Sequence, residues 1–515
     1  MSYPLELQGR RTKRDSEMAK PFEDDAKVMG VVEKATDSER GFAQSDSYGS
    51  STGGKTFDQK LLYKLDLKLM VAMFFLNFLS LMGRTNVGAA LIRQLPQDLK
   101  LDAMKVFIML TMPAAPLILF EVPSNLLMRF LDRRFNFSYM RYMCLLDVLL
   151  GVITLCQGFV KGYDQILVTR FLIGVFDAGL IPGCVFLCSL YYPPTHLQWR
   201  LGLITVANIC SSIVGNFLAY AIANIKTTDN FKGWRWIFII EGIITVVASL
   251  LCSVANVGPP NKAKFLTEEE KNIIKNSVES RSTSIGALAE WKLFLTNPLN
   301  YCWAALYCFT TTTAYSVSIF SPSFVKSFRP GLDDTEVQAQ VVPIFVVAAV
   351  ACLSTAYIAD RLNHRSAFGL VGFVFTIIGY AVLRNDKVES SNVTMMALYF
   401  IALGTFITLP MIWTLTMQNL QTPFQRAIGS GFVIGVGNVA SYISAWIFRI
   451  SEGPFYRRGM TTGMILAIIA FGILSGTWLY IFMHNKRLDS DDTTHPSAMH
   501  GQRKLINRRR FRYKA

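Results

Sequence analysis

The chain has 515 residues, of which 51% are hydrophobic and 17% are charged. In an average soluble domain about a quarter of the residues are charged, so this composition excludes an ordinary soluble globular protein. Apolar runs long enough to cross the roughly 30 Å of membrane hydrocarbon recur along most of the sequence. The formal net charge of +15 lies mainly in the tails and loops, which is typical of membrane proteins and does not indicate nucleic-acid binding.

The first expected element is a polar tail, residues 1–60, which is rich in serine, aspartate and lysine and is expected to be disordered. About twelve apolar runs follow. Each is expected to form a membrane-spanning helix, because a helix satisfies its own backbone hydrogen bonds inside lipid. The predicted spans are 66–92, 105–128, 139–159, 165–190, 200–223, 236–256, 299–321, 338–359, 366–384, 393–417, 426–448 and 461–483.

A polar stretch, residues 257–297, divides these spans six and six. Within it, Thr267 and Glu270 have the spacing of a capping box, which predicts the start of a short amphipathic helix. The predicted domains are the tail 1–60, a helical bundle 61–256, a cytosolic linker 257–297, a second bundle 298–485 and a basic tail 486–515. We therefore expect an all-α membrane protein with about twelve transmembrane helices in two six-helix halves, which is the plan of major facilitator superfamily transporters.

Basic segments set the expected orientation. RFLDRR and ADRLNHR follow the second and eighth spans, at equivalent places in the two halves. With twelve spans, both segments and both tails fall on one side of the membrane, and the positive-inside rule places that side in the cytosol. We expect a multi-pass protein of the plasma membrane with both termini cytosolic. Asn392 begins an Asn-Val-Thr glycosylation sequence in an expected outer loop, which agrees with this orientation.

The cysteines and histidines do not indicate a metal or catalytic site. The nine cysteines lie almost entirely in the apolar spans, where a packing role is expected rather than disulfides or metal binding. The five histidines lie in loops, at a helix end or in the tail, without the paired spacing of metal ligands. We expect no cofactor, no metal and no enzymatic activity.

Four charged side chains interrupt the apolar spans, namely Arg84, Glu121, Arg170 and Asp177. An ionisable group at membrane depth costs roughly 2.5–3.5 kcal/mol on insertion scales and usually marks a path for a substrate, ion or proton. The topology puts Arg84 and Arg170 at similar depth, and Asp177 lies two helical turns from Arg170 on the same face. Two guanidinium groups above a carboxylate form a receptor for an anion, because arginine grips carboxylates bidentately.

Asp177 has the complementary role in this hypothesis. Burial pushes a carboxylate toward its neutral form and a neighbouring arginine pulls it toward ionisation, so such a group can take up and release a proton. The alternative is a fixed ion pair, of Asp177 with Arg170 or Arg84, that only holds helices together. For Glu121, next to Pro123, a contact to a neighbouring helix is the favoured interpretation.

Amides and glycines in the second half allow two interpretations. Gln418, Asn419 and Asn438 either line the second half's share of a cavity or hold helices together by hydrogen bonds in lipid. Gly431 and Gly435 have the GxxxG spacing that allows close helix packing, and we interpret them as packing residues.

Several motifs resemble one transporter family. RFLIGVFDAGLIPG resembles the fourth-helix signature of the anion:cation symporter family, R-F-x-x-G-x-x-E-A-G-x-x-P-G. The segments GWRWIFIIEG, YDQILVTR, LFEVPSN, NFLSLMGRTNVGAA and AKFLTEEEK are also similar to that family, and the match covers about residues 60–485. The chain is most similar to the fungal allantoate, nicotinate and pantothenate permease branch. This resemblance implies proton-driven uptake of an organic carboxylate, with protons and the lipid bilayer as further partners, and we expect a monomer.

The resemblance also assigns roles to residues. The family's first-helix arginine falls on Arg84, its fourth-helix arginine on Arg170, and a substrate-contacting polar position of the fifth helix on Asn208. Its proton-binding carboxylate falls on Asp177, which is aspartate here rather than the usual glutamate. The residues expected to bind substrate are Arg84, Arg170, Asn208, Asn419 and Asn438, and those expected to couple protons are Asp177 and Glu241.

Three positions qualify this picture. Glu241 belongs to a family motif, and it is expected either to act in proton coupling or to pair with Arg235 or an outer loop. The family commonly has aspartate before the first-helix arginine, whereas this chain has Gly83, which leaves the proton stoichiometry open. Asp360-Arg361 with Arg365 resembles the superfamily's cytosolic-loop motif, which implies a conformational latch.

The leading hypothesis is a secondary active transporter that takes up a small organic anion, such as a vitamin or ureide acid, with protons by alternating access. One alternative is an exporter of a metabolite or drug on the same fold. A non-transporting nutrient sensor on a transporter scaffold is the alternative from another class.

Overall fold

The computed structural model describes residues 57–92, 95–223, 233–278, 286–329, 331–385, 390–448, 456–494 and 514. This part of the chain is all-helical, as predicted. The predicted tail 1–60 lies almost wholly outside the described residues. Of the predicted basic tail 486–515, residues 495–513 and 515 also lie outside them.

The first half of the chain forms helices at the six spans predicted there, and several of these spans consist of two consecutive segments. The helices are α2 (Gln59–Leu65), η1 (Asp66–Met70), α3 (Val71–Ile92), α4 (Leu95–Asp98), α5 (Ala103–Thr111), α6 (Ala114–Phe135), α7 (Tyr139–Gln157), α8 (Tyr163–Asp177), α9 (Leu180–Tyr191), η2 (Pro194–His196), α10 (Leu197–Ala223), α11 (Gly233–Cys252) and η3 (Ser253–Ala255). We call this group the N-terminal half.

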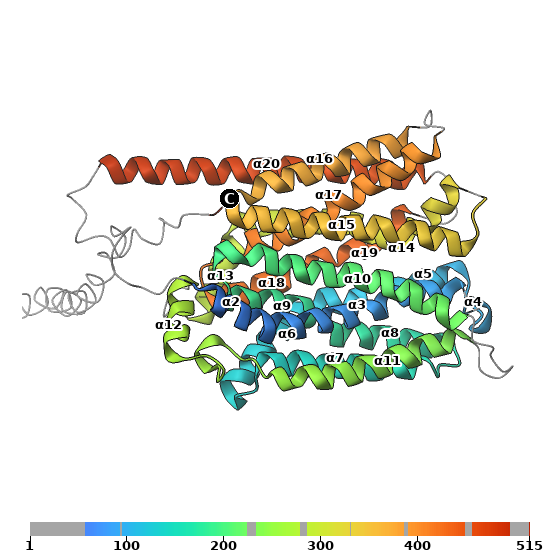
Figure 1. The fold of residues 1–515 in the computed structure, drawn as a ribbon, viewed down its shortest axis with the longest axis horizontal. Coiled ribbons are helices and arrows are strands. Elements are labelled where there is room, and N and C mark those ends of the chain that lie inside the picture. Colours follow the sequence, from blue (N-terminus) through green and yellow to red (C-terminus); the bar gives the residue numbers. More distant parts are fainter. Residues whose placement is uncertain are drawn as a thin grey trace, which may run out of the picture. The chain divides into compact units, whose positions relative to one another are not determined.

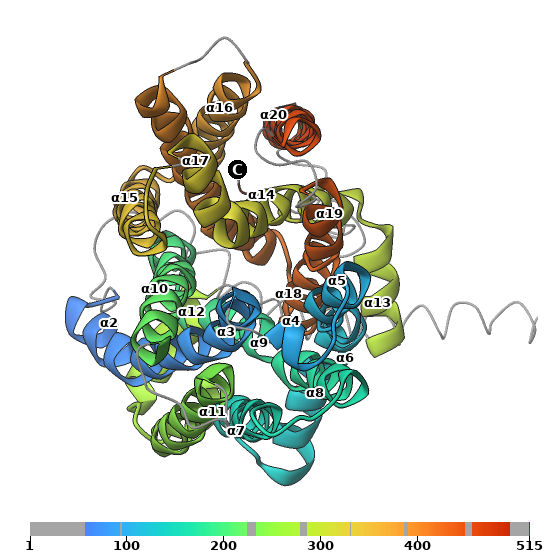
Figure 2. The ribbon, with the colours of Figure 1, turned by 90° about the vertical axis from the view of Figure 1, so that its right-hand side faces the viewer.

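The second half forms six long spans. They are α14 (Pro298–Phe328), α15 (Asp334–Leu362), α16 (Arg365–Arg384), α17 (Ser391–Gln418), α18 (Pro423–Gly437) with α19 (Val439–Ile447), and α20 (Arg457–Thr494). We call these helices the C-terminal half. The long helices of both halves run side by side (Figure 1), and the end-on view separates α3, α7, α8, α10 and α11 from α14–α17, α19 and α20 (Figure 2).

Eleven helices or helix pairs in the described residues are long and apolar enough to cross a membrane. The remaining predicted span, α14, is 31 residues long but is not among these eleven. Its run of four threonines, Thr310–Thr313, together with serines and asparagine, lowers its mean hydropathy. All four of these threonines are buried, so the polar groups of α14 are turned into the bundle.

The linker forms η4 (Pro260–Lys262), α12 (Glu268–Ser277) and α13 (Ala287–Thr296), which lie at the end of the bundle that we call the linker end (Figure 1). The predicted capping box is present, because Glu270 N donates to Thr267 Oγ1 over 3.2 Å and Thr267 N donates to Glu270 Oε2 over 2.8 Å. Two ion pairs attach the linker to the N-terminal half, Lys64–Glu270 at 2.7 Å and Lys262–Asp132 at 3.1 Å. Slight burial raises the pKa of Glu270, but the hydrogen bonds from Lys64 and Thr267 outweigh it and hold that pKa below its usual value.

Two spans are interrupted in the middle of the bundle. Helix α8 ends at Asp177 and α9 begins at Leu180, and a Cβ atom on Gly179 would collide with the Ser124 side chain. Helix α18 ends at Gly437 and α19 begins at Val439, with Asn438 at the junction. Irregular backbone at membrane depth is tolerated where it is buried in protein or lines a cavity, and in transporters it often forms the substrate site.

The predicted glycosylation sequence, which begins at Asn392, lies in the first turn of α17. The Asn392 side chain is exposed, and its Oδ1 accepts a hydrogen bond from Arg329 Nη2 over 2.7 Å. It lies at the start of α17, at the opposite end of that helix from Gln418 and the linker end. Glycosylation of Asn392 stays a prediction.

Candidate functional site

Three of the four charged residues singled out in the spans, Arg84, Glu121 and Asp177, gather where the two halves face each other. Arg84 on α3 directs both Nε and Nη2 to Oδ2 of Asp177, the last residue of α8. The hydroxyl of Ser80, one turn before Arg84 on α3, donates to the other carboxylate oxygen of Asp177. Of the two ion pairs considered from the sequence for Asp177, the structure contains the one with Arg84.

Hydrogen bonds continue from this ion pair into the C-terminal half and back. Arg84 Nη1 donates to the hydroxyl of Tyr315 on α14 over 3.4 Å, and Tyr315 donates to Asn438 Oδ1 over 3.2 Å. Asn438 Nδ2 then donates to Glu121 Oε1 on α6 over 2.6 Å. Ser80, Arg84, Asp177, Tyr315, Asn438 and Glu121 thus form one connected set, which we call the interface network.

The interface network is buried. The exposed fractions are 1% for Asp177, 2% for Glu121 and 5% for Asn438, and the Arg84 side chain is 12% exposed. Charges interact more strongly here than in water, because the surrounding protein has a low effective dielectric constant. A buried guanidinium group held by one carboxylate can exchange that partner for the carboxylate of another molecule.

Close helix packing brings Glu121 to Asn438. A Cβ atom on Gly431 would lie 2.9 Å from the backbone of Glu121, and one on Gly435 would lie 3.4 Å from Glu121 Oε2. The packing role predicted for Gly431 and Gly435 is therefore confirmed. Because neither glycine has a side chain, α18 approaches α6 closely enough for Asn438 to reach across the boundary between the halves.

Arg170 lies apart from this network. Its guanidinium group stacks 5.7 Å from the Phe238 ring centre, and its Nη1 donates to the Gly83 carbonyl over 3.5 Å. Glu241 on α11 is the carboxylate within electrostatic range of Arg170. None of the described bonds of Arg170 reaches Asp177, so the structure pairs one predicted arginine with Asp177 and places the other beside Glu241.

Gly83 faces this second group. A Cβ atom on Gly83 would lie 3.5 Å from Glu241 Oε1 and 3.9 Å from Thr154 Oγ1, which is ordinary contact distance. Gly83, which aligns with an aspartate of the family that the sequence resembles, thus faces another carboxylate. An aspartate here would put two acidic groups side by side next to Arg170, and glycine avoids that repulsion.

The remaining predicted binding residues are not part of the interface network. Asn208 on α10 is half-buried, and its Oδ1 has no hydrogen-bond partner in the described residues. Asn419 lies at the end of α17, where its Nδ2 donates to Lys514 O over 2.9 Å and its Oδ1 accepts from Lys514 N over 2.8 Å. The structure therefore pairs Asn419 with the backbone of Lys514, near the C-terminus.

At the linker end the halves are joined by a helix cap from Asp360 and a hydrogen bond from Arg365. Asp360, near the end of α15, accepts from the backbone N–H groups of Gln198 and Trp199 in the first turn of α10 over 3.2 and 2.8 Å. Arg365 Nη2 donates to Asp360 over 3.0 Å and to the Pro194 carbonyl over 2.5 Å. A carboxylate at a helix N-terminus satisfies unpaired N–H groups and complements the helix dipole. The residues that resemble the superfamily's latch motif thus connect α15 to α10.

Further contacts between the halves lie near Asp360 and Arg365. Gln418 Nε2 donates to Pro194 O over 3.1 Å, and Arg426 Nη1 donates to Ser189 O over 2.9 Å. Asn125 Nδ2 donates to Ala427 O over 3.0 Å. In this structure the halves are therefore held together at the linker end.

Replacing Asp360 by asparagine is expected to loosen the linker end. The change removes the charge that caps α10 and leaves Arg365, which is fully buried, without its carboxylate. Cys352 provides a natural probe, because it is buried on α15 about two helical turns from Asp360. Its Sγ lies 4.0 Å from the Gly202 carbonyl of α10. We expect a thiol reagent to modify Cys352 several-fold faster in Asp360→Asn, as measured by mass spectrometry.

The matched control is Asp333→Asn, which alters the capping box at the opposite end of α15. This control should leave the modification rate of Cys352 unchanged. Equal rates in wild type and Asp360→Asn would contradict the latch.

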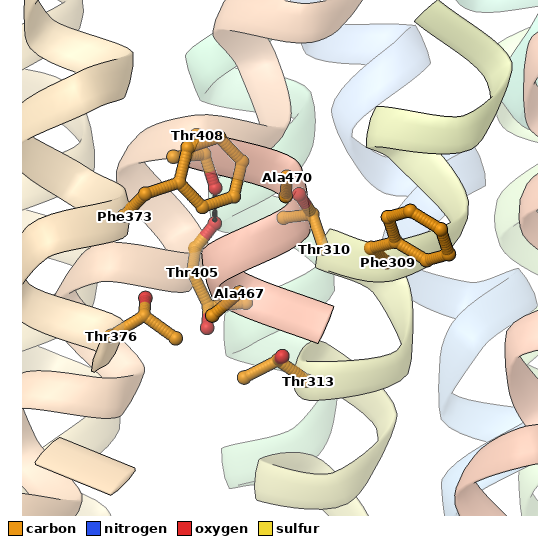
Figure 3. A pocket seen from close by; sticks show the side chains of 9 residues that line it. All are labelled: Phe309, Thr310, Thr313, Phe373, Thr376, Thr405, Thr408, Ala467 and Ala470. Carbon is orange, nitrogen blue, oxygen red and sulfur yellow. Dashed lines mark hydrogen bonds between the residues drawn. The ribbon is translucent and has the colours of Figure 1, made fainter. Parts of the chain in front are cut away.

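A pocket in the C-terminal half does not look like a binding site (Figure 3). It is lined by Phe309, Thr310, Thr313, Phe373, Thr376, Thr405, Thr408, Ala467 and Ala470. Four of the threonine hydroxyls donate to backbone carbonyls of their own helices over 2.7 to 3.1 Å. The pocket has no charged residue and no room for a water molecule, so it is a packing gap between helices.

The described residues contain no group of three histidine, cysteine or acidic side chains arranged to hold a metal ion. All nine cysteines are free in this structure. The interface network consists of an arginine, two carboxylates, a phenol, an amide and a serine hydroxyl.

Two helical halves with a buried ionic network between them are the arrangement found in many membrane transporters. The chain belongs to the Major Facilitator Superfamily, whose family model matches residues 73–448. It is accordingly a multi-pass membrane protein that carries a small molecule, and not an enzyme.

Individual proteins and structures are similar to this chain. It is 25% identical over 452 residues to an uncharacterised transporter of Schizosaccharomyces pombe, with coverage of 85% of this chain and 88% of that protein. It is 25% identical over 462 residues to the high-affinity nicotinic acid transporter of Saccharomyces cerevisiae, and the match covers 89% of this chain and 84% of that protein. The structure of the proton:xylose symporter XylE bound to 6-bromo-6-deoxy-D-glucose matches with a TM-score of 0.60 and 14% identity, covering 79% of this chain and 96% of XylE, which shows the shared fold.

Proposed function

We propose that this protein is a proton-coupled importer of a small organic anion, which it moves across the plasma membrane by alternating access. The observation that carries the proposal is the ion pair of Arg84 with Asp177, buried where the two halves meet. Arginine recognises carboxylates through two parallel hydrogen bonds and keeps its charge when buried. A substrate carboxylate is therefore the natural competitor of Asp177 for Arg84.

Protonation of Asp177 decides this competition. While Asp177 is ionised, it occupies two nitrogens of the Arg84 guanidinium group. When Asp177 takes up a proton, its attraction for Arg84 falls and the guanidinium group becomes available to the substrate anion. After the substrate leaves on the other side, Asp177 releases the proton and pairs with Arg84 again, so proton and anion move in the same direction.

Both halves contribute to the proposed site. Arg84 and Asp177 come from the N-terminal half, and Tyr315 and Asn438 come from the C-terminal half. A substrate that replaces Asp177 at Arg84 would lie against the phenol and the amide. Binding would then draw the halves together around the substrate, which is the movement that alternating access requires.

The proposed substrate class is a small carboxylic acid. The support is the chemistry of Arg84, the resemblance to the permease branch, and the similarity to a relative named as a nicotinic acid transporter. In the proposed orientation the linker end faces the cytosol, because the basic segments 129–134 and 360–365 lie at that end. The latch of Asp360 and Arg365 would then close the cytosolic side and leave the site to open outward.

Uptake measurements in cells test this function. Cells that express the protein should accumulate at least one labelled acid from a set of nicotinate, pantothenate, allantoate and similar carboxylates. Accumulation should be greater at an outside pH of 5 than of 7, and a proton uncoupler should abolish it. Uptake that does not change with pH or with the uncoupler would contradict proton coupling. Faster efflux of an acid from expressing cells than from control cells would favour the alternative function, an exporter.

A further inference from the structure

Glu121 is the carboxylate of the interface network that the proposed function does not use. It is 2% exposed, and Oε1 accepts a single hydrogen bond from Asn438 Nδ2 at 2.6 Å. Its other oxygen, Oε2, is buried and has no hydrogen-bond partner in the described residues. None of its described hydrogen bonds comes from a cation, in contrast to Asp177, which Arg84 holds directly.

The surroundings of Glu121 do not stabilise a buried anion. Its charged neighbours are Arg84 on α3 and Asp177 on α8, which already neutralise each other. Helix α14 adds the phenols of Tyr307 and Tyr315. On the facing side, Gly431 and Gly435 of α18 lie against Glu121 without a side chain, and the Asn438 amide at the end of α18 donates to it. An ionised carboxylate taken out of water loses several kcal/mol unless it is paired, so this group holds a proton more favourably than a charge.

Glu121 also lies on a contact that must open during transport. Helix α6 belongs to the N-terminal half and α18 to the C-terminal half, and α18 packs against the Glu121 backbone at Gly431. The same contact continues toward the linker end, where Asn125 donates to Ser430 Oγ over 2.9 Å. Separation of the halves at the linker end would part α6 from α18 and expose Glu121 to water. A glutamate carboxyl group in water is ionised at neutral pH, because its reference pKa is about 4.3.

We propose that Glu121 is a second proton-binding site of the transport cycle, loaded while α6 and α18 are packed together and unloaded when they separate. This inference rests on the proposed function, because it assigns a second proton to the same cycle. The polar path from Glu121 through Asn438 and Tyr315 to Arg84 links it to the substrate site. When Asp177 is protonated, the free charge of Arg84 favours loss of the Glu121 proton until a substrate anion neutralises Arg84, so substrate binding retains both protons.

The inference predicts the electrical behaviour of transport. A monovalent carboxylate carried with two protons moves one net positive charge, whereas the same anion carried with one proton moves none. In proteoliposomes containing the full-length protein, an inside-negative potential should therefore speed wild-type uptake of a monocarboxylate such as nicotinate, or whichever monovalent acid the uptake survey identifies. The Glu121→Gln variant should retain uptake driven by a pH gradient but lose its dependence on voltage. Glutamine keeps the size of the side chain and still accepts from Asn438.

Asp147→Asn is the matched control. Asp147 is also a fully buried carboxylate of the N-terminal half, but it lies between α7 and α11 and bonds to Ser249 over 2.5 Å. This variant should keep the voltage dependence of the wild type. Voltage dependence that persists in Glu121→Gln would overturn the inference.

A measurement on the wild-type protein keeps the inference testable if Glu121→Gln does not fold. The membrane potential at which net flux stops, determined at several pH gradients, gives the number of protons per anion. Two protons support the inference, and one proton overturns it while leaving the proposed function intact. Absence of any carboxylate uptake by the wild type would instead contradict the proposed function.

Discussion

Arg84→Ala is expected to abolish carboxylate uptake at substrate concentrations that saturate the wild-type protein. The change removes the proposed partner of the substrate and also leaves Asp177, which is 1% exposed, without its counter-charge. Truncating one member of a buried, hydrogen-bonded charge pair costs about 2–5 kcal/mol, which corresponds to an affinity loss of roughly 30-fold to several thousand-fold. Initial rates of uptake over a range of substrate concentrations measure this loss as an increase in KM.

Two further variants separate binding from general damage to the fold. Arg84→Lys keeps the charge but not the planar fork, so it should restore only part of the affinity. Arg200→Ala removes another largely buried ion pair, Arg200–Asp66 at 2.7 Å, which is not part of the interface network. Arg200→Ala should therefore leave KM close to the wild-type value. Wild-type KM in Arg84→Ala would exclude the proposed anion site.

Asp177→Asn is expected to separate substrate binding from proton-driven accumulation. Asparagine is permanently neutral, as the protonated aspartate would be, so Arg84 stays available and the anion still binds. Without substrate, however, Arg84 has no carboxylate to pair with, and the empty transporter must carry an unpaired buried charge through its return step. Net uptake should stop, while exchange of labelled for unlabelled substrate should continue.

The accumulation ratio measures this effect. A pH difference of two units can sustain up to about 100-fold accumulation for each coupled proton, since one pH unit corresponds to a tenfold change. In Asp177→Asn the ratio should fall to about one, with exchange preserved. Accumulation at the wild-type level would show that Asp177 does not couple protons to transport.

Most of the helices could be predicted because each span is a long apolar run that tolerates only one backbone solution in lipid. The interruptions after Asp177 and at Asn438 were not predicted, because they depend on tertiary packing. Gly179 allows α8–α9 to approach Ser124, and Gly431 allows α18 to approach α6. Neither approach is visible in hydropathy.

Part of the site could also be predicted. Arg84 and Asp177 stand out as charges in apolar spans, and Ser80 was detectable as a hydroxyl one helical turn from Arg84 on the same face. The partners of Arg84 could not be derived from spacing. Residues seven apart suggested that Arg170 and Asp177 would interact, but Arg84 reaches Asp177 from a facing helix while Arg170 turns to the Gly83 carbonyl.

The contacts across the halves were the least predictable part. The expectation that Glu121 contacts a neighbouring helix agrees with its hydrogen bond to Asn438, but that helix belongs to the other half of the chain. Tyr315 gave no signal, because a tyrosine in a threonine-rich span is equally consistent with packing. Such pairs depend on how two bundles dock, which a single sequence does not encode in any local pattern.

Proton movement during substrate uptake is the most direct test of the central claim, that the ion pair of Arg84 and Asp177 couples an organic anion to protons. Proteoliposomes with the purified protein are placed in weakly buffered medium, and the identified acid is added while the external pH is recorded. The account predicts that the medium becomes more alkaline as protons enter with the anion, and that Asp177→Asn removes this signal. Anion uptake by the wild type without any change in external pH would contradict the account.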